Sequence, residues 1–169
     1  SEARVGFADR AVEGGYFPPQ VSCKMIYEDR LPPEEESKAK KAVGKSFEPS
    51  VIDRSILKTF SYEYPYRPIQ MEHTTDEFTC LCPFSELPDQ ATITIKYVPN
   101  KLCIELKSLK YYFYSFRQVR IFHEHVVNKI LEDLVAVLDP IEISVVAKFA
   151  VRGGIASTAT ASYKKKEGG

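Results

Sequence analysis

Apolar and polar residues alternate most regularly in the segment ATITIKYV, residues 91–98. Ile93, Ile95 and Tyr97 fall on one face of this segment, with threonine and lysine side chains on the other. A period of two residues is typical of a strand that buries one face, so we expect a half-buried strand here. Similar patterns predict four further strands, at 57–64, 77–83, 141–151 and 155–163.

Two segments between these strands are predicted to be helical. The longer one covers 121–140 and carries an apolar stripe at three-four spacing, formed by Val126, Val127, Ile130, Leu131, Leu134, Val135 and Leu138. Asp133 is expected to lie off this stripe, and an Asp-Pro pair ends the helix. The shorter helix covers 108–117. Its aromatic run, residues 111–116, could stack on a flat ligand, but we expect it to pack in a core or a subunit interface.

Counted from residue 77, the predicted order is strand, strand, helix, helix, strand, strand. This order indicates an α+β fold with an antiparallel sheet and two helices on one face. The fold is assigned to a domain at 51–163, followed by a frayed tail at 164–169. Residues 1–50 are interpreted as an N-terminal extension, because 28–50 hold eleven charged residues and three prolines and resemble a solvated linker.

Composition and charge exclude several classes of protein. The chain has 169 residues, and its 23 basic and 23 acidic residues cancel, which disfavours a general nucleic-acid binder. No window approaches eighteen consecutive apolar residues, and the first residues lack an apolar signal-peptide core, so we expect a cytoplasmic protein without a membrane span. Four cysteines without a CxxC pair, together with three histidines, disfavour a disulfide framework and structural zinc. No Rossmann glycine motif or Walker A motif is present.

The strongest candidates for catalytic residues are Cys82 and Asp89. Cys82 stands at a strand end before a proline, and a cysteine there can serve as a nucleophile if its pKa is lowered. The alternative is a cysteine buried as a small hydrophobic residue. Asp89 follows seven residues later in a turn and could donate a proton beside the thiol, or could simply cap its own loop.

A histidine and a glutamate open the long predicted helix. His123 could move a proton, and Glu124 could accept N–H donors from a heterocycle. The alternative is ordinary first-turn chemistry, since acidic residues favour helix N-termini. His125 lies about 200° around the helix from His123, so the two do not share a metal site.

Basic residues near the strand-to-helix junction are candidates for phosphate binding. Lys107 and Lys110 are three residues apart and share a helix face, next to Glu105. Arg152 precedes two glycines, whose bare backbone allows a ligand to approach closely. Plain surface charge is the alternative for each of these residues.

These residues fall into motifs that resemble a known family. The stretch ELKSLKYY, residues 105–112, resembles at every position the signature of the NADPH-dependent nitrile reductases, the 7-cyano-7-deazaguanine reductases of queuosine biosynthesis. The resemblance covers roughly 57–163 and continues through FTCLCP (78–83), LPD (87–89), SFR (115–117), FHEHVVN (122–128) and RGGI (152–155).

The resemblance implies a fold and a reaction. Members have the tunnelling fold, in ββααββ order, and this chain looks like the single-module type. Their subunits form rings with active sites between neighbours, so we expect a homo-oligomer. The expected reaction converts the nitrile of 7-cyano-7-deazaguanine into the primary amine 7-aminomethyl-7-deazaguanine with two NADPH, without direct binding of nucleic acid or membrane.

The resemblance also implies roles for individual residues. Cys82 aligns with the nucleophile that forms a covalent thioimide, Asp89 with the acid that protonates the nitrogen, and His123 with a residue that assists proton transfer. The substrate-binding positions are Glu105, Leu106, His123 and Glu124. The positions that hold the NADPH phosphates are Lys107, Lys110 and Arg152. No metal ligand is assigned.

Three rival functions use a similar fold or ligand. One is a transferase that forms an amidine on the cyano-deazaguanine base within tRNA; the 105–112 motif and the zero net charge favour the reductase instead. Another is a zinc-dependent pterin cyclohydrolase, which needs a fuller set of ligands than three histidines supply. The third is a non-catalytic purine-binding module, which would not require both Cys82 and Asp89. The sequence departs from the family pattern at Glu86, where glycine is expected.

Overall fold

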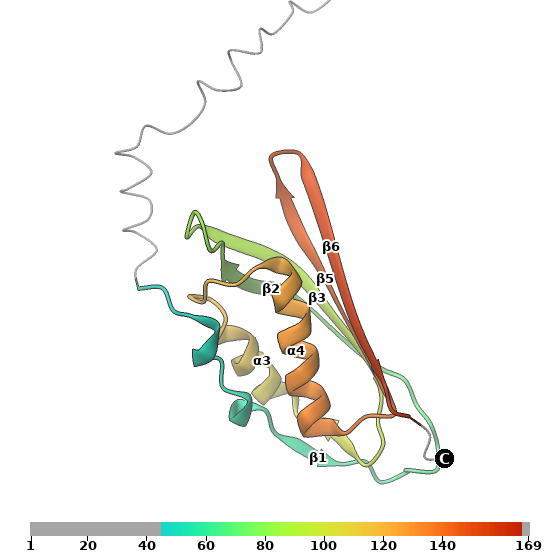
Figure 1. The fold of residues 1–169 in the computed structure, drawn as a ribbon. Helices are drawn as coiled ribbons and strands as arrows, with labels where there is room; N and C mark the ends of the chain where they lie inside the picture. The colour runs from blue at the N-terminus through green and yellow to red at the C-terminus, as the bar shows by residue number, and fades with distance from the viewer. Residues whose placement is uncertain (1–44, 167–169) are drawn as a thin grey trace, which may run out of the picture.

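A four-stranded antiparallel sheet with two helices on one face organises the protein (Figure 1). The computed structural model describes residues 45–166. The strands lie in the order β2-β3-β5-β6. Their bounds are β2 Met71–Leu81, β3 Pro88–Val98, β5 Glu142–Arg152 and β6 Ile155–Lys164, and the helices are α3 Leu106–Tyr114 and α4 His123–Leu138. The predicted α+β class is confirmed.

Short elements precede and interrupt this core. The strand β1, Thr59–Ser61, pairs with β4, Leu102–Ile104, in a separate two-stranded sheet. Two short 3₁₀ turns, η1 (Pro49–Val51) and η2 (Arg54–Ile56), lie ahead of β1. Of the strand predicted at 57–64, only the central residues Thr59–Ser61 form a strand.

The buried face of the sheet is the one that the sequence pattern indicates. Ile93, Ile95 and Tyr97 are each 1% exposed or less. Ile93 and Ile95 lie opposite Ala147 and Val145 of β5, which are also buried. On α4, the stripe residues that are fully buried against this face are Val126, Val127, Ile130, Leu134 and Leu138. Removal of this apolar surface from water is what holds the helices on the sheet.

The prediction that Asp133 lies off the buried face of α4 is wrong, because its carboxylate is buried. The Tyr112 hydroxyl of α3 donates to Asp133 Oδ2 at 2.6 Å, and Lys129 Nζ donates to both carboxylate oxygens at 2.9 and 2.8 Å. A buried charge is tolerated when it is paired and hydrogen-bonded in this way. Burial and the Asp133 carboxylate together raise the pKa of Tyr112 well above its usual range.

The helix α3 begins two residues before its predicted start. The Glu105 carboxylate accepts from the backbone N–H groups of Lys107 at 2.8 Å and Ser108 at 2.7 Å, and so caps the helix. The aromatic run in and after α3 packs mainly into the core, as expected, through the buried side chains of Tyr112, Phe113 and Phe116.

The strand predicted at 77–83 is the last part of a longer strand, β2, which continues back to residue 71 through a bulge between Thr75 and Phe78. Within the described range, no helix has the length and apolar character needed to cross a membrane. Most of the predicted extension at 1–50, including Cys23, and the last residues of the predicted tail lie outside the described residues.

Candidate active site

The nucleophile candidate and the acid candidate lie at adjacent strand ends. Cys82 directly follows β2, and Asp89 is the second residue of β3. The loop between them is closed by two backbone hydrogen bonds, from Cys82 N to Leu87 O at 3.0 Å and from Glu86 N to Cys82 O at 2.8 Å. Asp89 pairs in register with Cys80 on β2. This hairpin fixes where the two functional groups lie relative to each other.

The pKa values of Cys82 and Cys80 are shifted in opposite directions. Burial alone would raise the pKa of Cys82, but the Ser85 hydroxyl and the backbone N–H groups of Ser85 and Phe84 outweigh it and lower the pKa below the usual range. Burial, followed by the nearby Asp89 charge, raises the pKa of Cys80 to about 12. A thiolate is the reactive form, and Cys82 is the cysteine of this pair that loses its proton more readily.

Asp89 is held by side chains from two other elements. It is 3% exposed, and its Oδ2 lies 3.3 Å from His123 Nε2 at the start of α4. Its Oδ1 accepts a hydrogen bond from Arg152 Nη1 at the end of β5. The buried carboxyl group is therefore in contact with one residue that can exchange a proton and one fixed positive charge.

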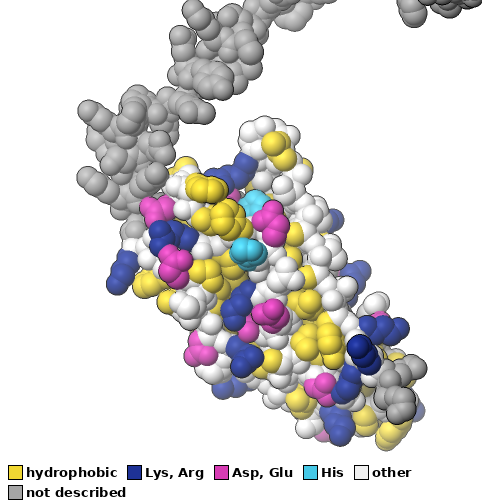
Figure 2. Space-filling model, in the orientation of Figure 1, with side chains coloured by type: hydrophobic (Ala, Val, Ile, Leu, Met, Phe, Trp, Pro, Cys, Tyr) yellow, Lys and Arg dark blue, Asp and Glu magenta, His cyan; other side chains and the backbone are white. Residues whose placement is uncertain are grey.

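The imidazole of His123 is oriented by stacking. Its ring lies parallel to that of Phe149 on β5, with centroids 3.6 Å apart and planes inclined by 6°. The next residue, Glu124, is exposed in the first turn of α4. Figure 2 shows histidine side chains beside acidic and apolar side chains on this face, over the start of α4. An exposed carboxylate there can accept hydrogen bonds from a ligand.

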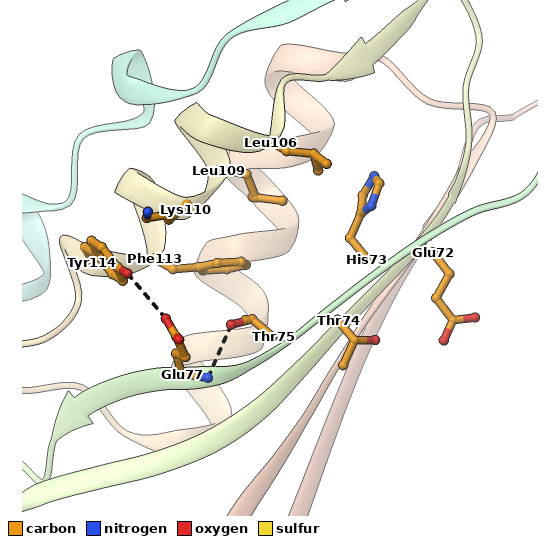
Figure 3. A pocket seen from close by; sticks show the side chains of 10 residues that line it. All are labelled: Glu72, His73, Thr74, Thr75, Glu77, Leu106, Leu109, Lys110, Phe113 and Tyr114. Atoms are coloured by element: carbon orange, nitrogen blue, oxygen red, sulfur yellow. Dashed lines mark hydrogen bonds between the residues drawn. The ribbon is translucent and has the colours of Figure 1, made fainter.

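A groove between α3 and β2 is lined by two further predicted residues, Leu106 and Lys110 (Figure 3). Its volume is about 380 Å³, and Leu106, Leu109 and Phe113 form much of its apolar wall. Lys110 lines it, with Nζ 5.7 Å from the centre of the Tyr114 ring. The groove is therefore apolar on the helix side, with Lys110 at one edge and the acidic side chains of Glu72 and Glu77 on the β2 side.

The carboxylate of Glu105 stands at the start of α3. Hydrogen bonds from the backbone N–H groups of Lys107 and Ser108 lower the pKa of Glu105 below its usual range, so it is ionised and acts only as an acceptor. Its free lone pairs can accept further hydrogen bonds.

The predicted site residues fall into two separate groups in this chain. The structure brings together Cys82, Asp89, His123 and Arg152, and Glu124 is adjacent. Glu105 follows Ile104, whose N–H donates to Tyr97 Oη. Tyr97 is eight residues from Asp89 along β3, a span of about 26 Å. Arg152 thus lies with Asp89 and not with Lys107 and Lys110, the other residues predicted to bind the cofactor.

Two contributors to the site were not singled out from the sequence. Phe149 stacks on His123, but the alternation of β5 indicated only a buried face, so no signal tied it to the histidine. Ser85 stands three residues after Cys82, and serine side chains often turn back to nearby groups at such spacings. Among residues 45–166, no group of three or more His, Cys, Asp or Glu residues could hold a metal ion.

Comparison with known proteins gives a consistent result. The sequence model of the QueF-like protein family matches residues 88–168. The NADPH-dependent 7-cyano-7-deazaguanine reductase of Chloroherpeton thalassium is 50% identical over 112 residues, covering 66% of this chain and 97% of the relative. The enzymes of that name from Chlorobium chlorochromatii and Caldanaerobacter subterraneus are 51% and 47% identical, covering 64% and 69% of this chain and 93% and 87% of their own.

One solved structure extends the comparison to the fold. The archaeosine synthase QueF-Like in the apo form superposes with a TM-score of 0.52 at 20% identity, covering 59% of this chain and 96% of that one. Fold and sequence together thus define an oxidoreductase built on the tunnelling fold. The chain belongs to the family of NADPH-dependent 7-cyano-7-deazaguanine reductases.

Proposed function

We propose that this chain reduces the nitrile of 7-cyano-7-deazaguanine to the primary amine with two NADPH, in the cytoplasm, as a step of queuosine tRNA modification. The observation that supports the proposal most strongly is the activated thiol of Cys82 beside a buried carboxyl group that contacts a histidine. The chain is 50% identical over 112 residues, and 51% identical over 108 residues, to two enzymes named NADPH-dependent 7-cyano-7-deazaguanine reductase.

The first step is a covalent addition. The Cys82 thiolate attacks the nitrile carbon, a carbon–sulfur bond forms, and one π bond of the nitrile breaks with its electron pair going to nitrogen. Asp89, which has taken the proton of the Cys82 thiol, passes that proton to the nitrogen, and the product is a neutral thioimide. His123, whose Nε2 lies 3.3 Å from Asp89 Oδ2, returns a proton to the carboxylate. A nucleophile divides one difficult reduction into easier steps.

When bound, NADPH supplies two hydrides per nitrile. After the first reduction the carbon–sulfur bond breaks, and its electron pair returns to Cys82. The carbon of the resulting imine accepts the second hydride, and Asp89, reprotonated through His123, supplies the proton that completes the amine. Stacking on Phe149 keeps the ring of His123 in place through these changes. Burial keeps the carboxyl group of Asp89 in place.

The residues on α3 fit a cofactor that carries phosphates. Lys107 and Lys110 are one turn apart, and within the described range neither has an acidic partner at ion-pair distance. Their charges are thus available to phosphate oxygens. Arg152 contacts Asp89 in this chain. We propose that Arg152 binds the cofactor phosphates together with Lys107 and Lys110, and that the two lysines come from a neighbouring copy of the chain.

Substrate recognition is assigned to two glutamates, the exposed Glu124 and the half-buried Glu105. A guanine-like base presents ring and exocyclic N–H donors, which suit the carboxylates of Glu124 and Glu105. Leu106 adds a backbone contact beside Glu105, and His123 closes the pocket. Strand β3 runs about 26 Å from Asp89 to Tyr97, whose hydroxyl accepts from the N–H of Ile104, the residue before Glu105. We therefore propose that a second copy of the chain supplies Glu105 and the lysines to each site.

The test follows nicotinamide absorbance after 7-cyano-7-deazaguanine is added with NADPH. We expect two NADPH oxidised per amine formed, no activity for Cys82→Ala, and near-normal activity for Cys103→Ala, which removes a buried cysteine from β4. Adduct formation at Cys82 without NADPH oxidation would instead indicate a transferase with another amine donor. Ligand binding without either signal would indicate a non-catalytic purine-binding module.

A further inference from the structure

The loop that carries Cys82 contains a residue in an unfavourable conformation. Glu86 has a φ of 56°, in the left-handed region that side chains with a Cβ rarely adopt. Its N–H donates to the carbonyl of Cys82, so the left-handed turn directly shapes the loop at the nucleophile. Such a conformation persists only where neighbouring groups hold it.

Those neighbouring groups come from two distant parts of the chain. Glu86 Oε1 accepts a hydrogen bond from Ser46 Oγ at 3.1 Å and from Arg120 Nη1 at 3.3 Å. Arg120 also donates through Nη2 to Glu48. The side chains of Glu86 and Arg120 are each 34% exposed, so the ion pair is partly shielded from solvent. One carboxylate oxygen therefore links the Cys82 loop to residues that precede the domain core.

Backbone hydrogen bonds also connect the segment around residue 47 to the end of β2. The segment 118–121 lies between residue 47 and the end of β2. On one side, Phe47 N donates to Gln118 O at 2.8 Å and Arg120 N donates to Phe47 O at 2.9 Å. On the other side, Leu81 N donates to Val119 O at 2.9 Å and Ile121 N donates to Leu81 O at 3.1 Å. Leu81 immediately precedes Cys82, so the chain at 46–48 is in register with the residue before the nucleophile.

We infer that Ser46, Glu86 and Arg120 form a clamp that positions the Cys82 loop, so that the segment before the domain core controls the reactivity of the nucleophile. Glu86 is a positioning residue in this scheme and does not contact the substrate. The role of the loop rests on the proposed function, but the clamp itself is a property of the folded chain.

The clamp matters to Cys82 because the donors to its sulfur belong to the clamped loop. The Ser85 hydroxyl and the N–H groups of Phe84 and Ser85 act against burial to lower the pKa of Cys82, and Glu86 is the next residue. If Glu86 leaves its left-handed conformation, these donors move away from the sulfur.

Other groups around Cys82 are left unchanged by a substitution at Glu86. Asp89 on β3 raises the pKa of Cys82, and its own partners are His123 of α4 and Arg152 of β5. Cys80 on β2 is the other titratable neighbour. A change in the titration of Cys82 in a Glu86 variant would therefore come from the loop.

The test measures the rate of Cys82 alkylation by iodoacetamide against pH, by mass spectrometry of the full-length protein without nitrile or NADPH. For Glu86→Ala we expect a higher titration midpoint and about threefold to tenfold slower alkylation at pH 7. Glu86→Gln keeps an oxygen acceptor for Ser46 and Arg120 and should restore most of the rate. Glu132→Ala, on the exposed face of α4, is the matched control and should behave as the unsubstituted protein.

A third substitution separates the clamp from the backbone conformation. Glu86→Gly relieves the left-handed strain but removes the clamp, so we expect it to slow alkylation as Glu86→Ala does. Normal alkylation in Glu86→Gly would show that the φ angle alone matters and would overturn the clamp. An unchanged midpoint in Glu86→Ala, with only a lower unfolding temperature, would reduce the cluster to a structural role. Because no substrate is used, either result stands apart from failure of the reductase assay.

Discussion

The Cys82 end of the sheet and the groove beside α3 are built in opposite ways. At the Cys82 end, the buried carboxylate of Asp89 is partnered within the chain by His123 and Arg152. In the groove, His73 Nε2 is buried without a hydrogen-bond partner among the described residues, and Lys110 has no acidic partner there. The first region is organised for chemistry before any ligand arrives. The second is organised to receive charge and hydrogen bonds from outside the chain.

Asp89→Asn tests the chemical region and should have the largest effect. We expect kcat to fall by about 10²- to 10⁴-fold, because the group that protonates the nitrile nitrogen is lost. Alkylation of Cys82 should become faster at neutral pH, because the Asp89 charge raises the pKa of the thiol and would be absent.

The control for that substitution is Asp139→Asn at the end of α4. Asp139 is exposed and has a φ of 44°, a conformation that asparagine tolerates well. Its activity should be unchanged. Slower alkylation of Cys82 in Asp89→Asn would contradict the assigned electrostatics, and retained reduction would contradict the role of Asp89 as acid.

Replacing Lys107 and Lys110 together by glutamine tests the binding region. We expect KM for NADPH to rise by about tenfold or more with a much smaller change in kcat, which is the pattern for lost binding of ground and transition states alike. Lys101→Gln, in the turn between β3 and β4, is the matched control. A fall in kcat with KM unchanged would place the lysines in the chemical step.

Tyr112→Phe tests the connection between the two regions. The hydroxyl joins α3, which forms the groove, to Asp133 of α4, which carries His123. Its loss leaves the buried carboxylate with Lys129 alone and should lower the free energy of unfolding by about 1–3 kcal/mol in urea denaturation. Tyr111→Phe, at an exposed position of the same helix, should change it little. Equal stabilities of the two variants would mean that the buried hydrogen bond contributes nothing.

The smallest expected effect concerns Cys80. Its pKa is raised to about 12, so it remains a thiol at pH 8 while the lowered pKa of Cys82 makes that residue increasingly a thiolate as the pH rises toward 8. Iodoacetamide at pH 8 should therefore modify Cys82 and leave Cys80 intact in tryptic peptide mapping. Comparable labelling of both residues in the folded protein would show that burial does not protect Cys80.

Local patterns in the sequence predicted the parts of this fold that depend on one element at a time. The alternation at 91–98 placed Ile93, Ile95 and Tyr97 correctly, because one buried face is enough to define it. The burial of Asp133 was missed because its partner, Tyr112, lies 21 residues away on another helix. The start of α3 was missed because Glu105 caps it with a side chain that continues an extended pattern.

The sequence predicts which residues make up the candidate site, but it does not predict how they are arranged. The motifs indicated Cys82, Asp89 and His123, while the contact of Arg152 with Asp89 depends on the register of β3 with β5 across 63 residues. No single segment contains that register. The conformation of Glu86 is likewise set by Ser46 and Arg120, which a local turn pattern does not include.

The most direct test of the central claim is the intact mass of the protein incubated with 7-cyano-7-deazaguanine without NADPH. Addition of a thiolate to a nitrile expels no leaving group, so the account predicts a mass increase equal to the whole nitrile, located on the Cys82 peptide. The increase should be absent in Cys82→Ala and should disappear when NADPH is added. A protein that turns over the nitrile with no adduct, or with an adduct at another residue, would contradict the role of Cys82 as the nucleophile.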